Sequence, residues 1–277
     1  MFEHGVPFRL NDRVRRLVAP NPGMMTGPGT NTYLLGTEQV AVVDPGPAIP
    51  EHIQAILAAG EGRIRWIICT HTHPDHSPAW QAVAAATRAE VIGALPADDR
   101  FQDDTFAPTT LLDHSWVLEA PEFTLRALHT PGHVSNHYCF LLEDDGMLFA
   151  GDHIMNGSTV VIVPPGGDMK AYIESLRLLL DYPLQSIAPG HGELIHTPVQ
   201  EVAGLVEHRL ARERKVIAGL SALGEGDLDA LVKVVYDDVD AARHEWAKLS
   251  LSAHLIKLAS EGRARSDAPA ERWTWLG

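Results

Sequence analysis

The chain has 277 residues, with 22 lysines and arginines against 36 aspartates and glutamates, and a formal net charge of −14. Hydrophobic residues make up 45% and charged residues 21%, which excludes a disordered or fibrous protein. The acidic balance disfavours non-specific binding to polyanions. No apolar stretch approaches the ~20 residues that span a bilayer, and the N-terminus lacks the apolar region of a signal peptide, so we expect no membrane partner. Two cysteines, each in an apolar run, exclude a disulfide scaffold and favour a cytoplasmic chain.

Short apolar runs alternate with turns rich in glycine and proline through most of the chain, and their β-branched residues predict strands. The predicted strands are 33–35, 40–43, 64–69, 90–92, 123–128, 138–142, 147–150, 159–163 and 186–188. Apolar stripes at helical spacing predict helices over 49–59, 78–89 and 169–180, with Ser77 and Asp168 as N-caps of the last two. Strands mixed with helices in this way predict an α/β fold with a mixed sheet.

The pattern changes after Pro198, where the strand-like runs stop until the last dozen residues. Helices are expected over 199–223, 228–235 and 246–260, followed by a hairpin of 263–265 and 272–275. The order helix, helix, hairpin is typical of a winged-helix module. We therefore expect a large domain over 1–200 and a small C-terminal domain over 201–277.

Four of the apolar runs end in a tight turn that carries side chains able to bind a metal. These side chains are His71, His73, Asp75 and His76 after 64–69, His133 after 123–128, Asp152 after 147–150, and His191 after 186–188. Loops at the carboxyl ends of strands are where α/β folds place their ligands. A single His-x-His pair is weak evidence, but four liganding side chains within six residues have no packing rationale. The sequence therefore predicts a metal centre.

The residue types indicate two metal ions. We expect one ion to be held by His71, His73 and His133 and a second by Asp75, His76 and His191, with the two oxygens of Asp152 bridging them. Imidazole and carboxylate ligands without thiolate suit zinc first, with iron or manganese as alternatives. Two such ions hold a bridging hydroxide at neutral pH and polarise the substrate oxygen.

At these residues the sequence resembles the metallo-β-lactamase superfamily, whose hallmark is the pattern His-x-His-x-Asp-His that begins at His71. Asp44, at the end of the run 40–43, matches the family's first motif, a carboxylate that orients the metal-binding loop. The resemblance covers about residues 10–200. It implies a four-layer αβ/βα sandwich, with two mixed sheets packed face to face between helices.

A closer likeness is to the subgroup that contains the mitochondrial β-lactamase-like endoribonuclease. The segments that carry it are GPGTNTYLLG (27–36), TPGHVSNH (130–137), FAGDHIMNGSTVV (149–161), APGHGELIH (188–196) and EHRLARERKV (207–216). That subgroup also has a small C-terminal winged-helix-like α+β domain. The resemblance makes His137 a candidate for contact with a substrate oxyanion or for proton donation, with packing as the alternative. Asn31 and Tyr172 are candidates for substrate binding at the rim of the site.

The expected function is that of a dinuclear metal-dependent hydrolase in which Asp75 orients the metal-bridging hydroxide and accepts its proton. The substrate stays open between a short single-stranded RNA or other phosphodiester, as in the subgroup, and a small-molecule ester or thioester, as in glyoxalase II-like relatives. The net charge of −14 counts against RNA, since polyanion binding needs a cationic track. β-Lactam opening is expected only as a promiscuous activity.

The alternative from another class is a metal-containing regulator that binds DNA through its winged helix. Acidic residues outnumber basic ones over residues 221–277, which is the wrong sign for a duplex binder. Duplex DNA is therefore not an expected partner. The C-terminal domain is instead expected to cover the rim of the active site or to form a homodimer interface.

Overall fold

The computed structural model describes residues 2–97, 99–267 and 272–277. The chain divides into two compact units. The first comprises Met1–Thr130, Asn136–Val160 and Tyr182–Val199, and the second comprises Pro131–Ser135, Val161–Asp181 and Gln200–Gly277. Two segments from within the expected catalytic domain thus cluster with the C-terminal residues. The domain boundaries 1–200 and 201–277 stay a prediction.

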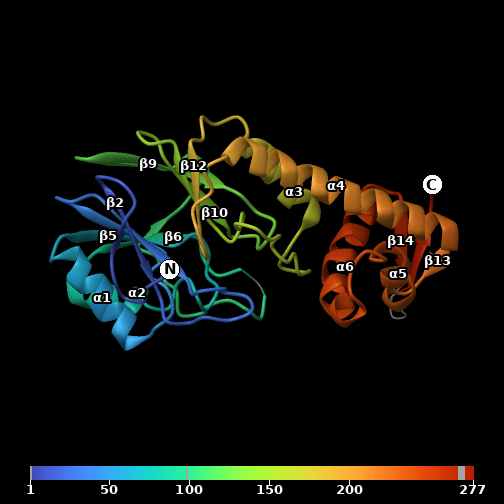
Figure 1. Cartoon of the computed structure of the whole chain (residues 1–277), viewed down its shortest axis with the longest axis horizontal. Coiled ribbons are helices and arrows are strands. Elements are labelled where there is room, and N and C mark those ends of the chain that lie inside the picture. The colour runs from blue at the N-terminus through green and yellow to red at the C-terminus, as the bar shows by residue number, and fades with distance from the viewer. Residues whose placement is uncertain (1, 98, 268–271) are drawn as a thin grey trace. The chain divides into compact units, whose positions relative to one another are not determined.

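The first unit contains a seven-stranded sheet in which the strands follow chain order from β1 to β7; β2, β5 and β6 of this sheet are labelled in Figure 1. The strands of the sheet are β1 (Phe8–Arg9), β2 (Val14–Val18), β3 (Asn31–Leu35), β4 (Val40–Val43), β5 (Ile64–Ile68), β6 (Glu90–Gly93) and β7 (Thr110–Leu111). Strands β1 to β4 pair antiparallel, and β4 to β7 pair parallel. Parallel neighbours need crossover connections. Helix α1 (Pro50–Gly60) joins β4 to β5, and α2 (Trp80–Thr87) joins β5 to β6.

A five-stranded sheet with the order β12-β11-β10-β9-β8 completes the first unit. Its strands are β8 (Val117–Ala120), β9 (Phe123–His129), β10 (Tyr138–Leu142), β11 (Met147–Gly151) and β12 (Ser186–Pro189). The strands from β8 to β11 pair antiparallel in succession, whereas β11 and β12 pair parallel. This sheet too is mixed.

The hydrophobic core lies between the two sheets, because every second side chain of a strand points to the face that the sheets share. Tyr33 of β3 packs against Phe149 of β11, with ring centroids 5.0 Å apart. Leu34, the residue between Tyr33 and Leu35, instead joins a second core cluster with Ile56 of α1. These two cores confirm the predicted α/β sandwich.

Parallel pairing brings strand ends together at the edge of each sheet. The backbone N–H of Asp44, just after β4, donates to Ile68 O at the end of β5 over 2.8 Å. In the other sheet the N–H of Gly190, just after β12, donates to Gly151 O at the end of β11, also over 2.8 Å. The predicted metal-binding turns therefore begin at paired strand ends.

The second unit is mainly helical. It contains α3 (Met169–Leu179), most of α4 (Pro198–Leu223), α5 (Leu228–Val235), the 3₁₀ turn η1 (Ala241–Arg243), α6 (His244–Ser260), and a small sheet of β13 (Glu225–Gly226), β15 (Arg272–Trp275) and β14 (Ala264–Asp267) in that order. Side chains of Asp168 and Asp227 cap α3 and α5 by accepting from Ala171 N and Ala230 N. Figure 1 shows α5, α6 and the small sheet gathered along α4. The predicted winged-helix pattern is confirmed.

Most predicted elements are present within a residue or two of their expected bounds. The prediction of a strand over 159–163 is wrong, because those residues adopt no regular structure. Strands β1, β2, β7, β8 and β13 were not predicted, and they are short or interrupted by charged residues. The turn expected between the two hairpin strands lies partly at 268–271, outside the described residues. None of the described helices is both long and apolar enough to cross a membrane.

Candidate metal centre

The predicted metal-binding loop starts directly after β5 and folds into a tight turn. The backbone N–H of His76 donates to His73 O over 2.9 Å, which closes the turn. The loop is fixed at its start because Thr70 O accepts a hydrogen bond from Tyr138 N at 2.8 Å. As a result, one short and fixed stretch of backbone sets the directions of four side chains, those of His71, His73, Asp75 and His76.

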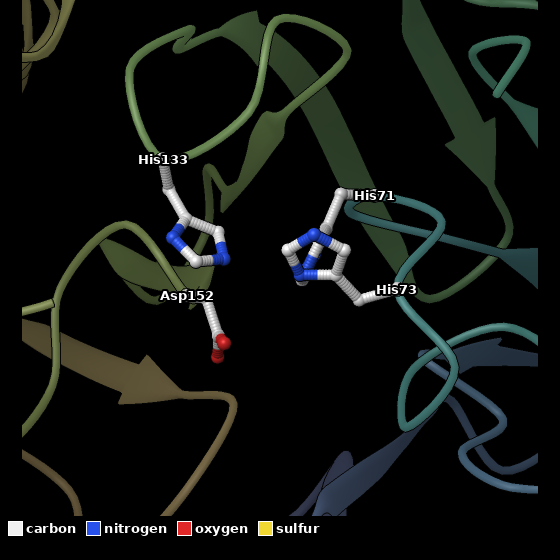
Figure 2. A group of neighbouring side chains, drawn as sticks. All are labelled: His71, His73, His133 and Asp152. Carbon is white, nitrogen blue, oxygen red and sulfur yellow. The ribbon is translucent and has the colours of Figure 1, made fainter. Parts of the chain in front are cut away.

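The structure gathers all seven predicted metal ligands into two groups. The first group is His71, His73, His133 and Asp152, and the second is Asp75, His76 and His191. Within each group, one ligand atom from every residue lies within 4.8 Å of the others. Figure 2 shows the side chains of the first group turned toward a common space. The rings of His71 and His76 lie 4.2 Å apart between centroids, so the two groups are adjacent.

Asp44 supports both groups. Its Oδ2 atom accepts hydrogen bonds from His76 Nδ1 at 2.9 Å and from Thr70 Oγ1 at 2.8 Å, and its Oδ1 accepts from Thr70 N at 2.7 Å. Since the Thr70 hydroxyl gives its proton to Asp44, Thr70 Oγ1 is the acceptor for His71 Nδ1, 3.0 Å away. The carboxylate thus fixes His76 directly and His71 through a threonine, which is the arrangement expected behind metal-binding histidines.

The histidine tautomers fit a metal centre. Besides His71 and His76, His133 Nδ1 donates to Val161 O at 3.0 Å and His191 Nδ1 donates to Gly29 O at 3.3 Å. With Nδ1 engaged as a donor, Nε2 is the nitrogen of each ring that is left to bind a metal ion in place of a proton. Four histidines therefore hold their ligating atoms ready, each oriented by a protein acceptor on its other side.

The charges around the second group call for a cation. His76 Nε2 lies 3.5 Å from Asp75 Oδ2 and 3.3 Å from Asp152 Oδ1, and His191 Nε2 lies 3.2 Å and 3.3 Å from the same two oxygens. A lone pair that faces a carboxylate is repelled unless a proton or a metal ion lies between them. Although burial opposes the change, the Asp152 carboxylate raises the pKa of His191 to about 9. The residues thus fit a divalent cation with oxygen and nitrogen ligands.

The first group differs because its His71 is held neutral. Burial, together with the neighbouring rings of His76 and His73, lowers the pKa of His71 well below its usual value. His71 Nε2 and His73 Nδ1 approach to 3.0 Å, a distance that needs a shared proton or ion between two lone pairs. Neutral imidazoles are the form in which histidine binds metals. This group therefore also fits a cation.

Asn31 is buried rather than exposed at a rim. Its amide nitrogen Nδ2 donates to Pro189 O and Gly192 O, each at 2.9 Å, and its backbone N–H donates to Gly190 O at 2.7 Å. Tyr33 Oη adds a hydrogen bond to Pro189 O at 2.7 Å. Asn31 thus holds the turn that carries His191, and a role in substrate binding stays a prediction.

Two further predicted residues are fully buried. His137 packs against the ring of His71 with centroids 5.1 Å apart, and its Nδ1 lies 3.0 Å from Thr130 Oγ1. Tyr172 likewise has no exposed surface, so it does not lie at an open rim of the site. Direct contact of either side chain with a substrate stays a prediction, and the packing alternative for His137 agrees with its burial.

Sequence reasoning gave no role to His52, which lies behind Asp44. Thr32 Oγ1 donates to Asp44 O at 2.6 Å and contacts His52 Nε2 at 2.9 Å. His52 is completely buried, and burial lowers its pKa to about 4, so it stays neutral. It lies eight residues after Asp44, in the first turn of α1, and belongs to no recognisable motif. Its contact with Thr32 of β3 appears only in the fold.

The sequence matches two known families. The pattern of the metallo-beta-lactamase superfamily matches residues 25–191, and that of the beta-lactamase associated winged helix domain matches residues 228–273. A relative from Caenorhabditis elegans, "Beta-lactamase-like protein 2 homolog", is 31% identical over 97% of this chain and 91% of its own. An "Atrochrysone carboxyl ACP thioesterase" from Aspergillus chevalieri is 35% identical over 76% of this chain and 67% of its own.

Solved structures agree on the fold. A metallo-beta-lactamase family protein from Thermus thermophilus aligns with a TM-score of 0.79 at 22% identity, covering 97% of this chain and all of its own. Superfamily members typically bind two divalent metals, and this chain supplies the two groups of ligands. The superfamily pattern spans more than half of the chain, and the metal-binding turns fall within it. This chain therefore belongs to the metallo-β-lactamase superfamily, as a hydrolase with an associated winged-helix domain.

Proposed function

We propose that this protein is a hydrolase of small thioesters that works with two divalent metal ions, zinc being the first expectation. The observation that carries the proposal is the convergence of the two ligand groups, in which histidine Nε2 atoms and two carboxylates face one space. Ions held there lower the pKa of water and stabilise negative charge that develops on a substrate carbonyl oxygen. The residues of this chain would position the attacking water and the substrate carbonyl next to each other.

Asp75 is assigned the role of orienting the attacking water and accepting its proton. Its side chain is 27% exposed, against 11% for Asp152, so it is the more accessible carboxylate of the two. Burial opposes ionisation, but His76 and His191 together lower the pKa of Asp75. The carboxylate is therefore ionised at neutral pH and able to accept a proton.

The charges on α4 favour a thioester over RNA. This helix carries the strongest basic cluster of the sequence, and in the structure its cations are already engaged. Arg212 pairs with Asp238 at 2.8 Å, Lys215 pairs with Asp237 at 2.8 Å, and Arg209 is only 3% exposed. A polyanion needs free cations to neutralise its phosphates, whereas a small thioester does not. The thioesterase among the relatives supports the same choice.

The winged helix gives no better support to a DNA-binding regulator. Arg272 pairs with Glu225 at 2.9 Å, and Arg265 lies 3.4 Å from Asp267. Cations paired in this way offer little to a duplex backbone. Short single-stranded RNA is the second substrate to test, because two ions can hold one scissile phosphate without a cationic track.

The test compares both substrate classes on one preparation. Zinc-loaded protein is incubated with acyl thioesters of N-acetylcysteamine, with thiol release followed by a chromogenic reagent, and with end-labelled single-stranded RNA. The control is Asp152→Ala, which removes a ligand. We expect thiol release that the variant loses, and no RNA cleavage. RNA cleavage that depends on Asp152, without thiol release, would overturn the thioester proposal in favour of a phosphodiesterase.

A further inference from the structure

The loop that carries His133 is attached to α3. Asp168 N, at the start of this helix, donates to Gly132 O over 2.8 Å, and Ser175 Oγ donates to Pro131 O over 2.8 Å. His133 Nδ1 donates to Val161 O in the segment that leads into α3. All these partners belong to the second unit. The direction of the His133 side chain is therefore set by where α3 lies.

The contact between the loop and Tyr172 leaves no free space. Gly132 has a φ of +147°, and a Cβ atom placed on it would lie 2.4 Å from Tyr172 Cα and 2.5 Å from Tyr172 Cβ. The loop backbone thus rests directly on the backbone of α3 at this residue. A shift of Tyr172 moves the loop with it, because no compressible side chain lies between them.

The other side of Tyr172 faces α4. The guanidinium carbon of Arg209 lies 5.2 Å from the centroid of the Tyr172 ring, within the range of a cation–π interaction. Farther along α4, Glu213 pairs with Lys257 of α6 at 2.8 Å, which ties the two helices together. Helix α3 also packs against α6. Arg209 therefore lies on a helix, α4, that is held to α6 by an ion pair.

Burial of Arg209 argues for more than packing. Taking a guanidinium out of water costs free energy, and an apolar side chain of similar volume often stabilises a buried position better. The planar cation instead provides a directional contact with one ring. Such a contact fixes the rotation of Tyr172, and with it the backbone against which Gly132 rests.

We propose that Arg209 and Tyr172 are positioning residues for the metal ligand His133, acting through Gly132. This inference rests on the proposed metal centre. The chain of contacts is Arg209 on the Tyr172 ring, Tyr172 backbone on Gly132, and the neighbouring His133 held toward the first ligand group. The C-terminal helices thereby take part in metal binding without supplying a ligand.

The experiment uses the full chain and compares Arg209→Met with Arg212→Met. Arg212 is a matched control, since it lies on the same helix and its guanidinium also stacks on a tyrosine ring, but on Tyr236, 4.2 Å away, rather than on Tyr172. Amide hydrogen exchange is measured on metal-free protein. We expect the amides of Gly132 and Asp168 to exchange about tenfold faster in Arg209→Met, and to be unchanged in Arg212→Met.

Zinc affinity is measured on the same variants by competition with a chromogenic chelator. We expect Arg209→Met to lower the affinity for one of the two zinc ions by about tenfold and to leave the affinity for the other unchanged. The variant Tyr172→Leu should reproduce this loss, and the double variant should be no worse than the stronger single one, since both act through one contact. The proposal would be overturned if the affinities for both zinc ions fell equally, or if the losses of the two single variants added up in the double variant.

The exchange measurement separates the two possible failures. If the native protein binds no divalent ion, the proposed function fails, whereas local exchange at Gly132 and Asp168 still reports the positioning contact. If Arg209→Met instead speeds exchange throughout α4 and α6, the arginine serves the stability of the second unit alone. Unchanged exchange in Arg209→Met would also overturn the positioning role.

Discussion

A single oxygen of Asp44, Oδ2, accepts hydrogen bonds from His76 Nδ1 at 2.9 Å and from Thr70 Oγ1 at 2.8 Å. Thr70 in turn accepts from His71, so one carboxylate determines the tautomer of a histidine in each ligand group. Asp44 is itself held in the left-handed region, with a φ of 50°. A non-glycine residue in this region indicates that the surroundings fix the backbone there.

Asp44→Asn tests this relationship. An amide in place of the carboxylate cannot accept from both His76 and Thr70 as strongly, so the rings lose their fixed tautomers. We expect both zinc ions to bind about 10–100-fold more weakly, as measured by chelator competition. The exposed Asp181→Asn is the control and should leave the affinity unchanged. Native affinity in Asp44→Asn would show that the carboxylate is not needed for orientation.

Gly190→Ala should disturb the second ligand group. A Cβ atom on Gly190 would lie 2.7 Å from His76 Cε1 and 2.8 Å from Asp152 Oδ1, closer than real Cβ contacts allow. The side chains must move apart, and we expect zinc content and hydrolysis to fall at least tenfold. Gly204→Ala, where a Cβ meets nothing within 4 Å inside α4, should instead be neutral or stabilising by about 0.5–1 kcal/mol. Full zinc content in Gly190→Ala would contradict the tight fit.

His52 predicts a loss of stability in acid. Burial lowers its pKa to about 4 in the folded protein, so below pH ~6.5 the unfolded chain takes up a proton that the folded chain does not. The free energy of unfolding should therefore fall as the pH drops from about 6.5 toward 4, by on the order of 3 kcal/mol from this group. Urea unfolding of metal-free protein measures the slope.

The variant His52→Gln isolates that contribution. Glutamine keeps a polar partner for Thr32 and does not titrate, so the pH dependence should be flatter than in the native protein over the same window. The other titrating groups are common to both proteins and cancel in the difference. Identical slopes would mean that His52 takes up its proton over the same pH range in the folded and the unfolded chain, against the lowered pKa.

Glu213→Ala should destabilise the second unit. Glu213 and Lys257 are both about nine-tenths buried at their side chains, and removal of the carboxylate leaves the Lys257 ammonium to pair with Glu261, 2.7 Å away. We expect a loss of about 1–3 kcal/mol in the free energy of unfolding. Glu207→Ala breaks the exposed pair with Arg214 on the same helix and should cost under about 1 kcal/mol. Equal losses in the free energy of unfolding would show that the buried pair contributes no more to stability than the exposed pair.

Local patterns sufficed to predict the helices, the ligand turns and most of the strands. The cluster from His71 to His76 is dense enough to have no packing explanation. The turns of Asp152 and His191 follow β11 and β12, which pair parallel, and the turn of His133 follows β9. Strand β2 escaped prediction because Arg15 and Arg16 interrupt its apolar pattern. Arg16 is nevertheless almost fully buried, paired with Glu193 at 2.9 Å.

The residues behind the ligands could not be assigned from sequence because their roles depend on distant partners. Asn31 acts on residues more than 150 positions away, and Tyr172 is buried by Arg209 from another helix. No periodicity or spacing records such contacts. The same reason explains why His52 had no visible role, although its contact with Thr32 lies directly behind Asp44.

Two of the parallel strand pairs, β4 with β5 and β11 with β12, also bear on how the protein folds. The hydrogen bond from Asp44 to Ile68 O closes one edge, and that from Gly190 to Gly151 O closes the other, each across a crossover connection. Long-range pairings of this kind form late, because the loss of chain entropy precedes the contacts that compensate it. High-affinity metal uptake must therefore follow assembly of both sheets, and its rate during refolding reports the slowest step of that assembly.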